Sequence, residues 1–169
     1  MPEIYWVDDA LGFRVAILAR PRGGSWLADE ARELKANGVD IVVSFLTPDE
    51  ERELALEGER EAMEAQGMKY ISFPIEDCGT PASMSGAQAL IGELLKEMKS
   101  GKAMGYHCRA SIGRSPMIAA AVLAASGIPV DRALMALSEA RGWQVPETDD
   151  QRRWIDRFLD SLKSGERPS

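Results

Sequence analysis

An unbroken run of apolar and β-branched residues, Asp-Ile-Val-Val-Ser-Phe-Leu at positions 40–46, constrains the fold of this chain more than any other segment. A strand with one face in water alternates apolar and polar residues, and this run does not alternate. It therefore predicts a strand that is buried on both faces. Strands of this kind belong to parallel sheets whose two faces are covered by helices.

The other segments alternate between strand and helix patterns, as a helix-covered parallel sheet requires. Strands are expected at residues 14–18, 40–46, 69–73 and 102–107, and helices at 25–37, 47–66, 85–99, 115–126, 130–141 and 148–163. Ser25 is expected to cap the first of these helices, and Gly58 to interrupt the second. We predict an α/β fold with a single domain over residues 1–169, in which a central, mostly parallel sheet carries helices on both faces. Its core spans about residues 14–163, followed by a frayed tail at 164–169.

The composition excludes several classes of protein. With 20 Lys and Arg against 27 Asp and Glu, the net charge of −7 argues against a nucleic-acid-binding protein or a polybasic membrane-surface protein. Two cysteines are too few for a disulfide scaffold, so a reducing, cytoplasmic location is expected. The first residues show no signal-peptide pattern, and no apolar run approaches the ~20 residues of a membrane helix. The sequence does not predict an oligomeric state.

The sequence Tyr-His-Cys-Arg-Ala-Ser-Ile-Gly-Arg-Ser at positions 106–115 lies between an expected strand and a nearly all-apolar expected helix. A turn at such a place directs successive backbone N–H groups toward one point, where they can bind an anion. The Arg114 side chain adds a planar fork of donors that matches a phosphate group. The segment therefore predicts a phosphate-binding loop. Its residues are Arg109, Ala110, Ser111, Ile112 and Gly113.

The positive field that binds phosphate also stabilises a thiolate. Cys108 is therefore expected to be ionised near neutral pH, because thiols in such sites have a pKa of roughly 3.5–7.5 instead of about 8.5. A thiolate can attack phosphorus in line and form a phosphocysteine. Arg114 would bind the equatorial oxygens more tightly in the transition state than in the ground state. Cys108 and Arg114 are thus candidate catalytic residues, and this chemistry requires neither a metal nor another cofactor.

The segment from His107 and Cys108 to Arg114 and Ser115 resembles the signature of the protein-tyrosine phosphatase superfamily. The sequence Phe-Pro-Ile-Glu-Asp-Cys-Gly-Thr-Pro at positions 73–81 resembles the general-acid loop of that family. Residues 38–44 are similar to its second core strand, so the resemblance spans most of the chain. The most similar groups are the compact kinase-associated and the bacterial dual-specificity-like phosphatases.

The resemblance implies roles for residues around the loop. Asp77 would protonate the leaving alcohol and then activate the attacking water. Ser115 would donate a hydrogen bond to the sulfur of Cys108 and help it leave in the second step, and His107 would orient the loop. Many members of the family have glycine where this chain has Ser111, so this loop must accommodate a Cβ atom.

Other residues of the expected site have two interpretations each. Gln151 either positions the hydrolytic water, as in kinase-associated relatives, or closes a capping box with Thr148. Glu76 competes with Asp77 as the acid. Cys78 either forms a protective disulfide with Cys108 under oxidation or is an ordinary loop cysteine.

Two charged residues near the expected site have their own alternatives. Arg109 is either a surface charge or part of a positive mouth of the pocket. Glu50 could brace Arg114, as an acidic residue does in some relatives. It is instead expected at the solvated start of the acidic helix over residues 47–66.

These residues favour a phosphomonoesterase that acts on phosphotyrosine, or on phosphoserine and phosphothreonine, in proteins. Phosphoinositide phosphatases often carry two extra basic residues in the loop, whereas this loop has only Arg109. The alternatives are a non-catalytic phosphate-binding module and a rhodanese-type sulfurtransferase. Ser115 and Asp77 favour the phosphatase, because neither alternative needs both an acid and a hydroxyl beside the sulfur. The expected partner is a phosphorylated protein.

Overall fold

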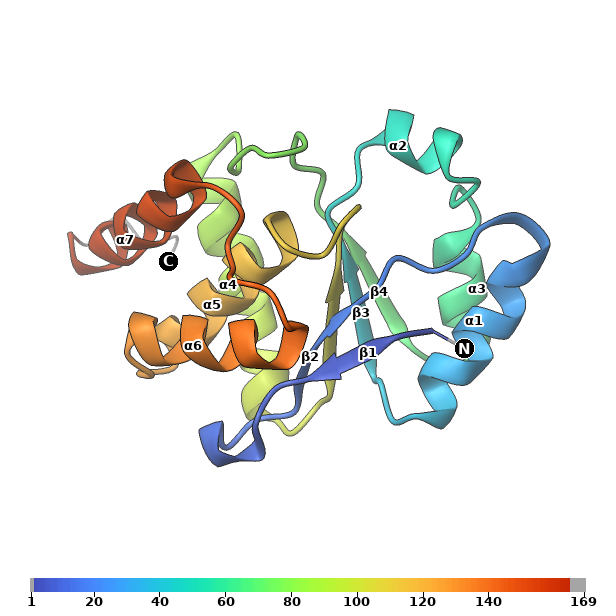
Figure 1. The fold of residues 1–169 in the computed structure, drawn as a ribbon, viewed down its shortest axis with the longest axis horizontal. Helices are drawn as coiled ribbons and strands as arrows, with labels where there is room; N and C mark the ends of the chain where they lie inside the picture. The colour runs from blue at the N-terminus through green and yellow to red at the C-terminus, as the bar shows by residue number, and fades with distance from the viewer. Residues whose placement is uncertain (1, 165–169) are drawn as a thin grey trace.

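The computed structural model describes residues 2–164, which form a five-stranded sheet with helices on both faces (Figure 1). The strand order is β1-β2-β5-β3-β4, in which β1 is antiparallel and the others are parallel. The strands are β1 Ile4–Trp6, β2 Val15–Leu18, β3 Ile41–Ser44, β4 Lys69–Ser72 and β5 Met104–His107. The helices are α1 Leu27–Ala36, α2 Pro48–Glu53, α3 Glu59–Ala65, α4 Met84–Lys99, α5 Arg114–Ala125, α6 Val130–Arg141 and α7 Asp149–Lys163. The predicted mostly parallel α/β sheet is confirmed.

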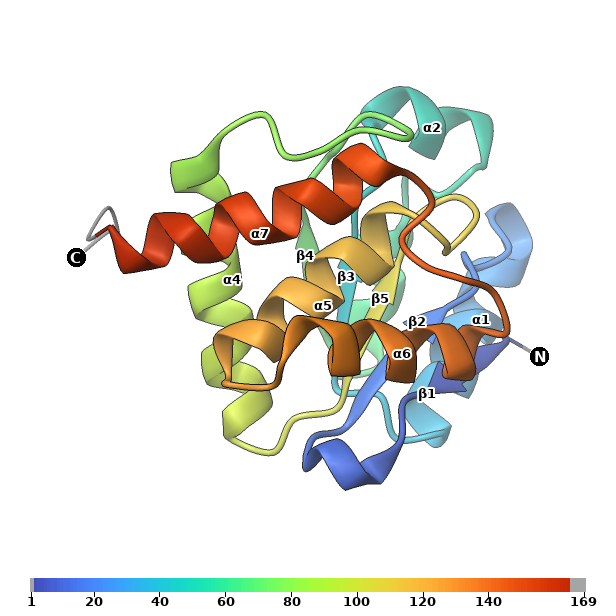
Figure 2. The same cartoon turned by 60° about the vertical axis from the view of Figure 1, so that its left-hand side comes forward.

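The two faces of the sheet carry different groups of helices (Figures 1 and 2). Helices α1 and α3 cover one face, over a cluster that includes Leu34, Val42 and Met63. Helices α4 to α7 cover the other face, around a larger core in which α5 is buried over nearly its whole length. Every residue of β2, β3 and β5 is buried, as the unbroken apolar run at 40–46 predicts.

Strand β5 lies between β2 and β3 and leads directly into the expected phosphate loop. The loop therefore leaves the carboxyl end of the middle strand, which is where open parallel sheets place their ligand sites. The ends of β2 and β3 flank it. Backbone bonds continue past the regular pairing, since the N–H of Phe45 donates to the carbonyl of His107 at 3.1 Å.

The structure differs from the sequence-based expectation at two places. Strand β1 was not expected; it is a three-residue antiparallel edge strand, too short for a clear periodic pattern. Ser25 is not a helix cap, because the chain makes a 3₁₀ turn over Gly24–Trp26 before α1 begins. The expected interruption of the acidic helix near Gly58 is confirmed, because the segment forms two helices, α2 and α3, and Gly58 is the N-cap of α3.

The C-terminal helix α7 ends at Lys163, and the expected frayed tail at 164–169 lies outside the described residues apart from Ser164. Within residues 2–164, none of the helices has the length and apolar character needed to cross a membrane.

The loop after β2 is held against the segment that joins α2 to α3 by a close backbone contact at Gly23. The N–H of Gly24 donates to the carbonyl of Ala55 at 2.8 Å. A Cβ atom at Gly23 would collide with the carbonyl oxygen of Leu54 and would lie 2.5 Å from that of Ala55. Only glycine therefore allows the two loops to approach so closely.

Replacing Gly23 by alanine should destabilise the protein by about 1–3 kcal/mol, the usual effect of overpacking a site that cannot relax. Urea unfolding followed by circular dichroism measures this change. Gly92→Ala is the matched control, because a Cβ at this position in α4 meets nothing within 4 Å. That control should stabilise the protein by about 0.5–1 kcal/mol through helix propensity. Equal effects of the two substitutions would contradict the close contact.

Candidate active site

Residues Cys108–Gly113 form a loop between β5 and α5, so the strand and the buried helix fix both of its ends. Cys108 is only 2% exposed, and its Sγ lies 3.2 Å from the Oγ of Ser115 in the first turn of α5. The N-terminus of a helix presents free N–H groups and a partial positive charge. The loop therefore places a thiol and a hydroxyl together at a point suited to an anion.

Ser111 takes up the left-handed backbone conformation that glycine would supply more easily. Its φ is 62°, and its hydroxyl donates to the carbonyl of Leu18 at 2.5 Å. This bond joins the loop to the end of β2. The Cβ atom is thus accommodated in the loop, and the side chain provides a hydrogen bond that glycine could not.

Arg114 is almost fully buried and is held by a carboxylate and by two backbone carbonyls. Its Nη1 and Nη2 donate to the two carboxylate oxygens of Glu50 at 2.7 and 2.9 Å. Nη1 also donates to the carbonyls of Ile75 at 2.8 Å and Phe45 at 3.3 Å. Burial alone would lower the pKa of Arg114, but the bonds to Glu50 and the nearby Cys108 and Asp77 raise it. The guanidinium is therefore a permanent positive charge beside Cys108.

For Glu50 the preferred interpretation, a solvated helix start, is wrong, and the alternative that it braces Arg114 is confirmed. Glu50 is buried, not solvated, and it serves two purposes. It closes a capping box with Thr47 at the start of α2 and also binds Arg114 through both oxygens. Burial would raise the pKa of Glu50, but the bond from Arg114, with those from Thr47, lowers it overall. The pattern Thr47-Pro-Asp-Glu50 indicated the start of a helix, but by itself it could not indicate the distant arginine.

Asp77 and its competitor Glu76 are both exposed, and Asp77 lies beside the guanidinium. The Oδ1 of Asp77 accepts from Nη2 of Arg114 at 3.2 Å and from the N–H of Cys78 at 3.0 Å. The side chain of Asp77 is 60% exposed, so it lies at the mouth of the site and can meet both substrate and water.

His107 is fully buried below the loop and forms an ion pair with Glu59 of α3. The Nε2 of His107 lies 2.5 Å from a Glu59 oxygen, and its Nδ1 lies 3.3 Å from the carbonyl of Cys108. The hydroxyl of Tyr70 donates to the other Glu59 oxygen at 3.2 Å. Burial alone would lower the pKa of His107, but the charge and hydrogen bond of Glu59 raise it. The pair connects α3 to the backbone of Cys108, and Glu59 was missed because the acidic segment was expected to be solvated.

Gln151 forms the capping box, which was one of the two interpretations offered for it. Its Oε1 accepts from the N–H of Thr148 at 3.2 Å, and its Nε2 donates to the carbonyl of Gly79 at 3.1 Å. The side chain therefore ties the start of α7 to the loop that carries Asp77. The amide also borders the phosphate loop, since a Cβ on Gly113 would lie 3.1 Å from it.

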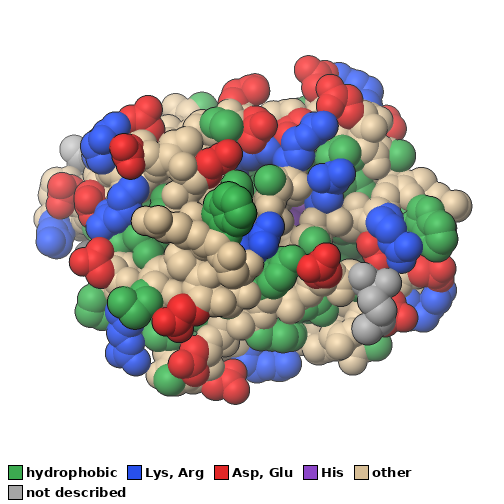
Figure 3. All heavy atoms as spheres, in the orientation of Figure 1, with side chains coloured by type: hydrophobic (Ala, Val, Ile, Leu, Met, Phe, Trp, Pro, Cys, Tyr) green, Lys and Arg blue, Asp and Glu red, His purple; other side chains and the backbone are tan. Residues whose placement is uncertain are grey.

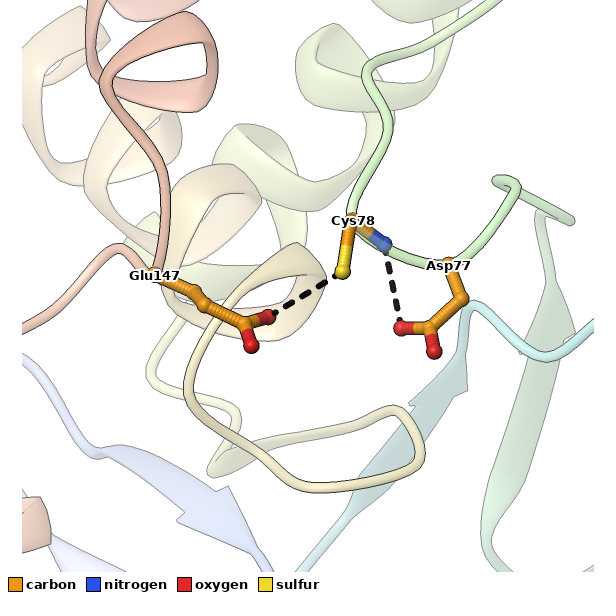
Figure 4. Close-up of side chains that lie close together, drawn as sticks. All are labelled: Asp77, Cys78 and Glu147. Atoms are coloured by element: carbon orange, nitrogen blue, oxygen red, sulfur yellow. Dashed lines mark hydrogen bonds between the residues drawn. The ribbon is translucent and has the colours of Figure 1, made fainter.

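Cys78 and Glu147 lie at the same edge of the site as Asp77 (Figure 4). The thiol of Cys78 donates to Glu147 at 3.7 Å. Both cysteines are free; burial and the nearby carboxylates of Asp77 and Glu147 raise the pKa of the exposed Cys78. Among the described residues, these three side chains are the group that could hold a metal ion, with their ligand atoms within 4.8 Å of one another. All three are exposed, and Asp77 already binds Arg114.

Arg109 is partly exposed at the outer side of the loop, in keeping with a mouth residue that is also a surface charge. Its Nη1 lies 3.0 Å from a carboxylate oxygen of Glu53 and 3.8 Å from one of Glu50. Ala110 is exposed and Ile112 is half-buried. The structure thus brings the sequence-predicted residues together around one loop.

The pKa of His107 should be measurable directly, because it is the single histidine of the chain. In the wild type, NMR titration of the imidazole should give a value above the usual 6.5 or so. In Glu59→Gln the burial remains and the carboxylate is lost, so the value should fall below 6.5 or so. The pH dependence of folding stability should have opposite signs in the wild type and in Glu59→Gln. The wild type loses the contribution of protonated His107 as pH rises through the raised pKa, whereas the variant loses stability as pH falls below about 6.5.

Glu64→Gln is the matched control for that titration. Glu64 lies on the same helix α3, but it pairs with Arg60 at the surface. This substitution should leave the titration of His107 unchanged. A pKa of His107 below the usual value in the wild type would show that burial dominates and that the ion pair with Glu59 is absent in solution.

Comparison with known proteins gives concordant matches. The family model described as "Polymorphic toxin system, DSP-PTPase phosphatase" matches residues 17–128. Cyclin-dependent kinase inhibitor 3 of Rattus norvegicus is 27% identical over 135 residues, covering 79% of this chain and 63% of that protein. The chain therefore spans less than two thirds of the length of this curated relative.

Solved structures show the same fold. The crystal structure of kinase associated phosphatase, with its catalytic-site cysteine replaced by serine, superimposes with a TM-score of 0.85 at 22% identity, covering 96% of this chain and 97% of that one. PTPMT1 in complex with PI(5)P gives a TM-score of 0.71 at 18% identity, covering 90% and 94%. The family model spans most of the chain, including the whole phosphate loop. The chain therefore belongs to the DSP-PTPase phosphatase family of polymorphic toxin systems.

Proposed function

We propose that this protein is a cysteine-dependent phosphomonoesterase that hydrolyses phosphotyrosine, and phosphoserine or phosphothreonine, in proteins. The observation that carries the proposal is the placement of the Cys108 thiol. It is buried at the N-terminus of an apolar helix, 3.2 Å from the Ser115 hydroxyl and within the field of the Arg114 guanidinium. A site that only bound phosphate would need neither a thiol there nor a carboxylic acid at the mouth.

The first step transfers the phosphoryl group to sulfur. The thiolate of Cys108 attacks phosphorus as the bond from phosphorus to the leaving oxygen breaks, and Asp77 gives its proton to that oxygen. The loop N–H groups and Arg114 stabilise the charge on the equatorial oxygens. Glu50 and the two carbonyls that hold Nη1 fix the plane of the guanidinium, so little reorganisation is needed.

The second step returns the enzyme to its starting state. Water attacks the phosphocysteine, Asp77 takes a proton from that water, and the bond between phosphorus and sulfur breaks to release inorganic phosphate. The Ser115 hydroxyl donates a hydrogen bond to the departing thiolate of Cys108. Gln151 supports this step indirectly, because its amide is bonded to the Gly79 carbonyl and holds the loop that carries Asp77.

Phosphorylated proteins are the proposed substrates and partners, and the cytoplasm is the proposed location. The similarity to cyclin-dependent kinase inhibitor 3 and kinase associated phosphatase supports a phosphoprotein substrate. Arg109 is the single basic residue between Cys108 and Arg114, which is fewer than a highly charged inositol phosphate favours. The phosphoinositide in the PTPMT1 complex makes that lipid class the main comparison in any substrate panel.

Cys108→Ser should abolish turnover of phosphotyrosine peptides and p-nitrophenyl phosphate while the protein still folds and binds phosphate. A serine hydroxyl is not ionised in this field near neutral pH, whereas the loop N–H groups and Arg114 are retained. Steady-state kinetics and calorimetric titration with inorganic phosphate measure the two properties. Cys78→Ser is the matched control and should keep most of the activity, because only the thiol contact to Glu147 is removed. Turnover of even a few per cent in Cys108→Ser would sink the mechanism.

Asp77→Asn should slow hydrolysis of tyrosyl and alkyl phosphates by roughly 10²–10⁴-fold, the range typical of general acid catalysis. The substitution should slow hydrolysis of p-nitrophenyl phosphate less, because the p-nitrophenolate leaving group is stable as an anion. The wild-type rate should fall on the alkaline side as the acid loses its proton, and this fall should vanish in the variant. Glu76→Gln is the control for charge at the same loop and should keep the alkaline fall. The reverse pattern would identify Glu76 as the acid.

A further inference from the structure

A groove with a volume of about 350 Å³ lies between α6 and the segment that joins α6 to α7. Its lining includes Pro146 and the buried side chains of Leu134 and Val145. Met135 also lines it and is 63% exposed, more than any other large hydrophobic side chain in the part of the chain that the structure describes. The N–H of Val145 donates to the Ser138 hydroxyl at 3.1 Å, which holds the joining segment against α6. The groove is therefore a defined hollow with apolar side chains on its floor.

The charged residues around this groove are mainly acidic. Asp131 and Asp149 are exposed carboxylates, and Arg152 is the one cation among the described lining residues. Arg152 is shared between Asp131 at 3.3 Å and Asp156 at 3.0 Å. Asp149 forms no ion pair with any cation of the described chain. The groove therefore has a carboxylate to offer to a positive charge that comes from outside the protein.

The joining segment separates the groove from the phosphate loop by the thickness of one chain. Pro146 and Thr148 line the groove, whereas the carboxylate of Glu147 between them lies 3.1 Å from a Cβ position on Gly113. Glu147 also lies beside Asp77 at the mouth of the catalytic site (Figure 4). An extended peptide advances about 3.3–3.6 Å per residue. A bound phosphopeptide would thus reach the groove about two to four residues from its phosphorylated residue.

Glu147 makes a positive occupant more favourable. Its carboxylate borders a site that is proposed to bind a phosphate dianion, and its partner among the described residues is the thiol of Cys78 at 3.7 Å. Like charges repel, so a positive group of the substrate close to Glu147 would offset this repulsion. Acidic and basic side chains are intermixed on the face that Figure 3 shows, so the net charge of −7 alone selects no place for a cation. The carboxylates of Glu147 and Asp149 select one.

We propose that the groove binds the side chain of a lysine or arginine that lies about two to four residues from the phosphorylated residue of the protein substrate. The inference rests on the proposed phosphatase function and extends it to sequence preference. Long basic side chains lay their apolar stems along apolar surface and keep the charged head outside it. The stem would pack on Leu134 and Met135, and the head would meet Asp149. Glu147 adds negative potential along the path from the phosphate loop.

The test uses phosphotyrosine peptides that differ at one position. The parent peptide has alanine around the phosphotyrosine, and six others carry a single lysine two, three or four residues before or after it. At the best position, a further peptide carries norleucine, which keeps the apolar stem without the ammonium group. The measured quantity is the ratio of kcat/KM for each peptide to that for the parent. The best lysine position should give a ratio of roughly threefold to fivefold at low salt. This ratio should fall as ionic strength rises.

Two substitutions and a matched control locate the effect. Asp149→Asn should lower the lysine ratio to about that of norleucine, because the carboxylate is lost and the apolar lining remains. Met135→Ala should lower both ratios. Asp150→Asn removes the same charge from the next residue of α7, which pairs with Arg153 and does not line the groove, so the ratio should not change. Because each readout is a ratio within one protein, a general loss of activity cancels.

Peptide binding in the Cys108→Ser background separates this proposal from the proposed function. Calorimetric Kd values need no turnover, so a preference for lysine that Asp149→Asn removes would support the groove even if the wild type hydrolyses none of the peptides. Equal Kd values for the alanine peptide and all six lysine peptides would overturn the subsite. Equal losses in Asp149→Asn and Asp150→Asn would also overturn it, because they would indicate attraction to the net charge of the chain. A norleucine peptide that binds as well as the lysine peptide would assign the groove to an apolar residue and overturn the recognition of a basic one.

Discussion

The buried ion pair between Arg114 and Glu50 is the interaction on which the rest of the site depends. Removing one partner from such a pair leaves an unpaired charge inside the protein, which typically costs about 3–5 kcal/mol. Here the same guanidinium also holds the carbonyls of Phe45 and Ile75, just beyond β3 and β4. The arginine that is proposed to clamp phosphate therefore also joins three segments of chain. Its position is fixed before any ligand arrives, which lowers the cost of organising the transition state.

A second buried ion pair, between His107 and Glu59, supports the loop from below. The two carboxylates come from α2 and α3, a segment that the sequence suggested would be solvated and interrupted near Gly58. The acidic segment has a mixed role: most of its charges face water, while two point inward at the phosphate loop. Charged residues are almost never fully buried unless they are paired, so each inward carboxylate requires its own cationic partner.

The sequence predicted the layers of the fold well, because burial of a strand or helix leaves a local pattern. The apolar run at 40–46 and the Ala-rich helix after Arg114 are examples. It failed where the determining contact is distant. Glu50 and Arg114 are 64 residues apart, and Glu59 and His107 are 48 apart. A capping box identifies Glu50 as a helix residue whether or not it also binds an arginine. No local signal therefore distinguished a solvated Glu50 from one that is buried against Arg114.

The loop between β5 and α5 shows how charge is distributed in an acidic protein that is proposed to bind phosphate. One side of its backbone offers N–H groups to the catalytic site, and the carbonyls on the other side need donors of their own. Arg20 and Arg141 supply those donors, although a neutral side chain such as asparagine could have satisfied the same carbonyls. The use of arginine adds positive potential directly behind the loop, where it strengthens the field at Cys108. Satisfying the backbone carbonyls and adding positive potential behind the loop are therefore achieved by the same two side chains.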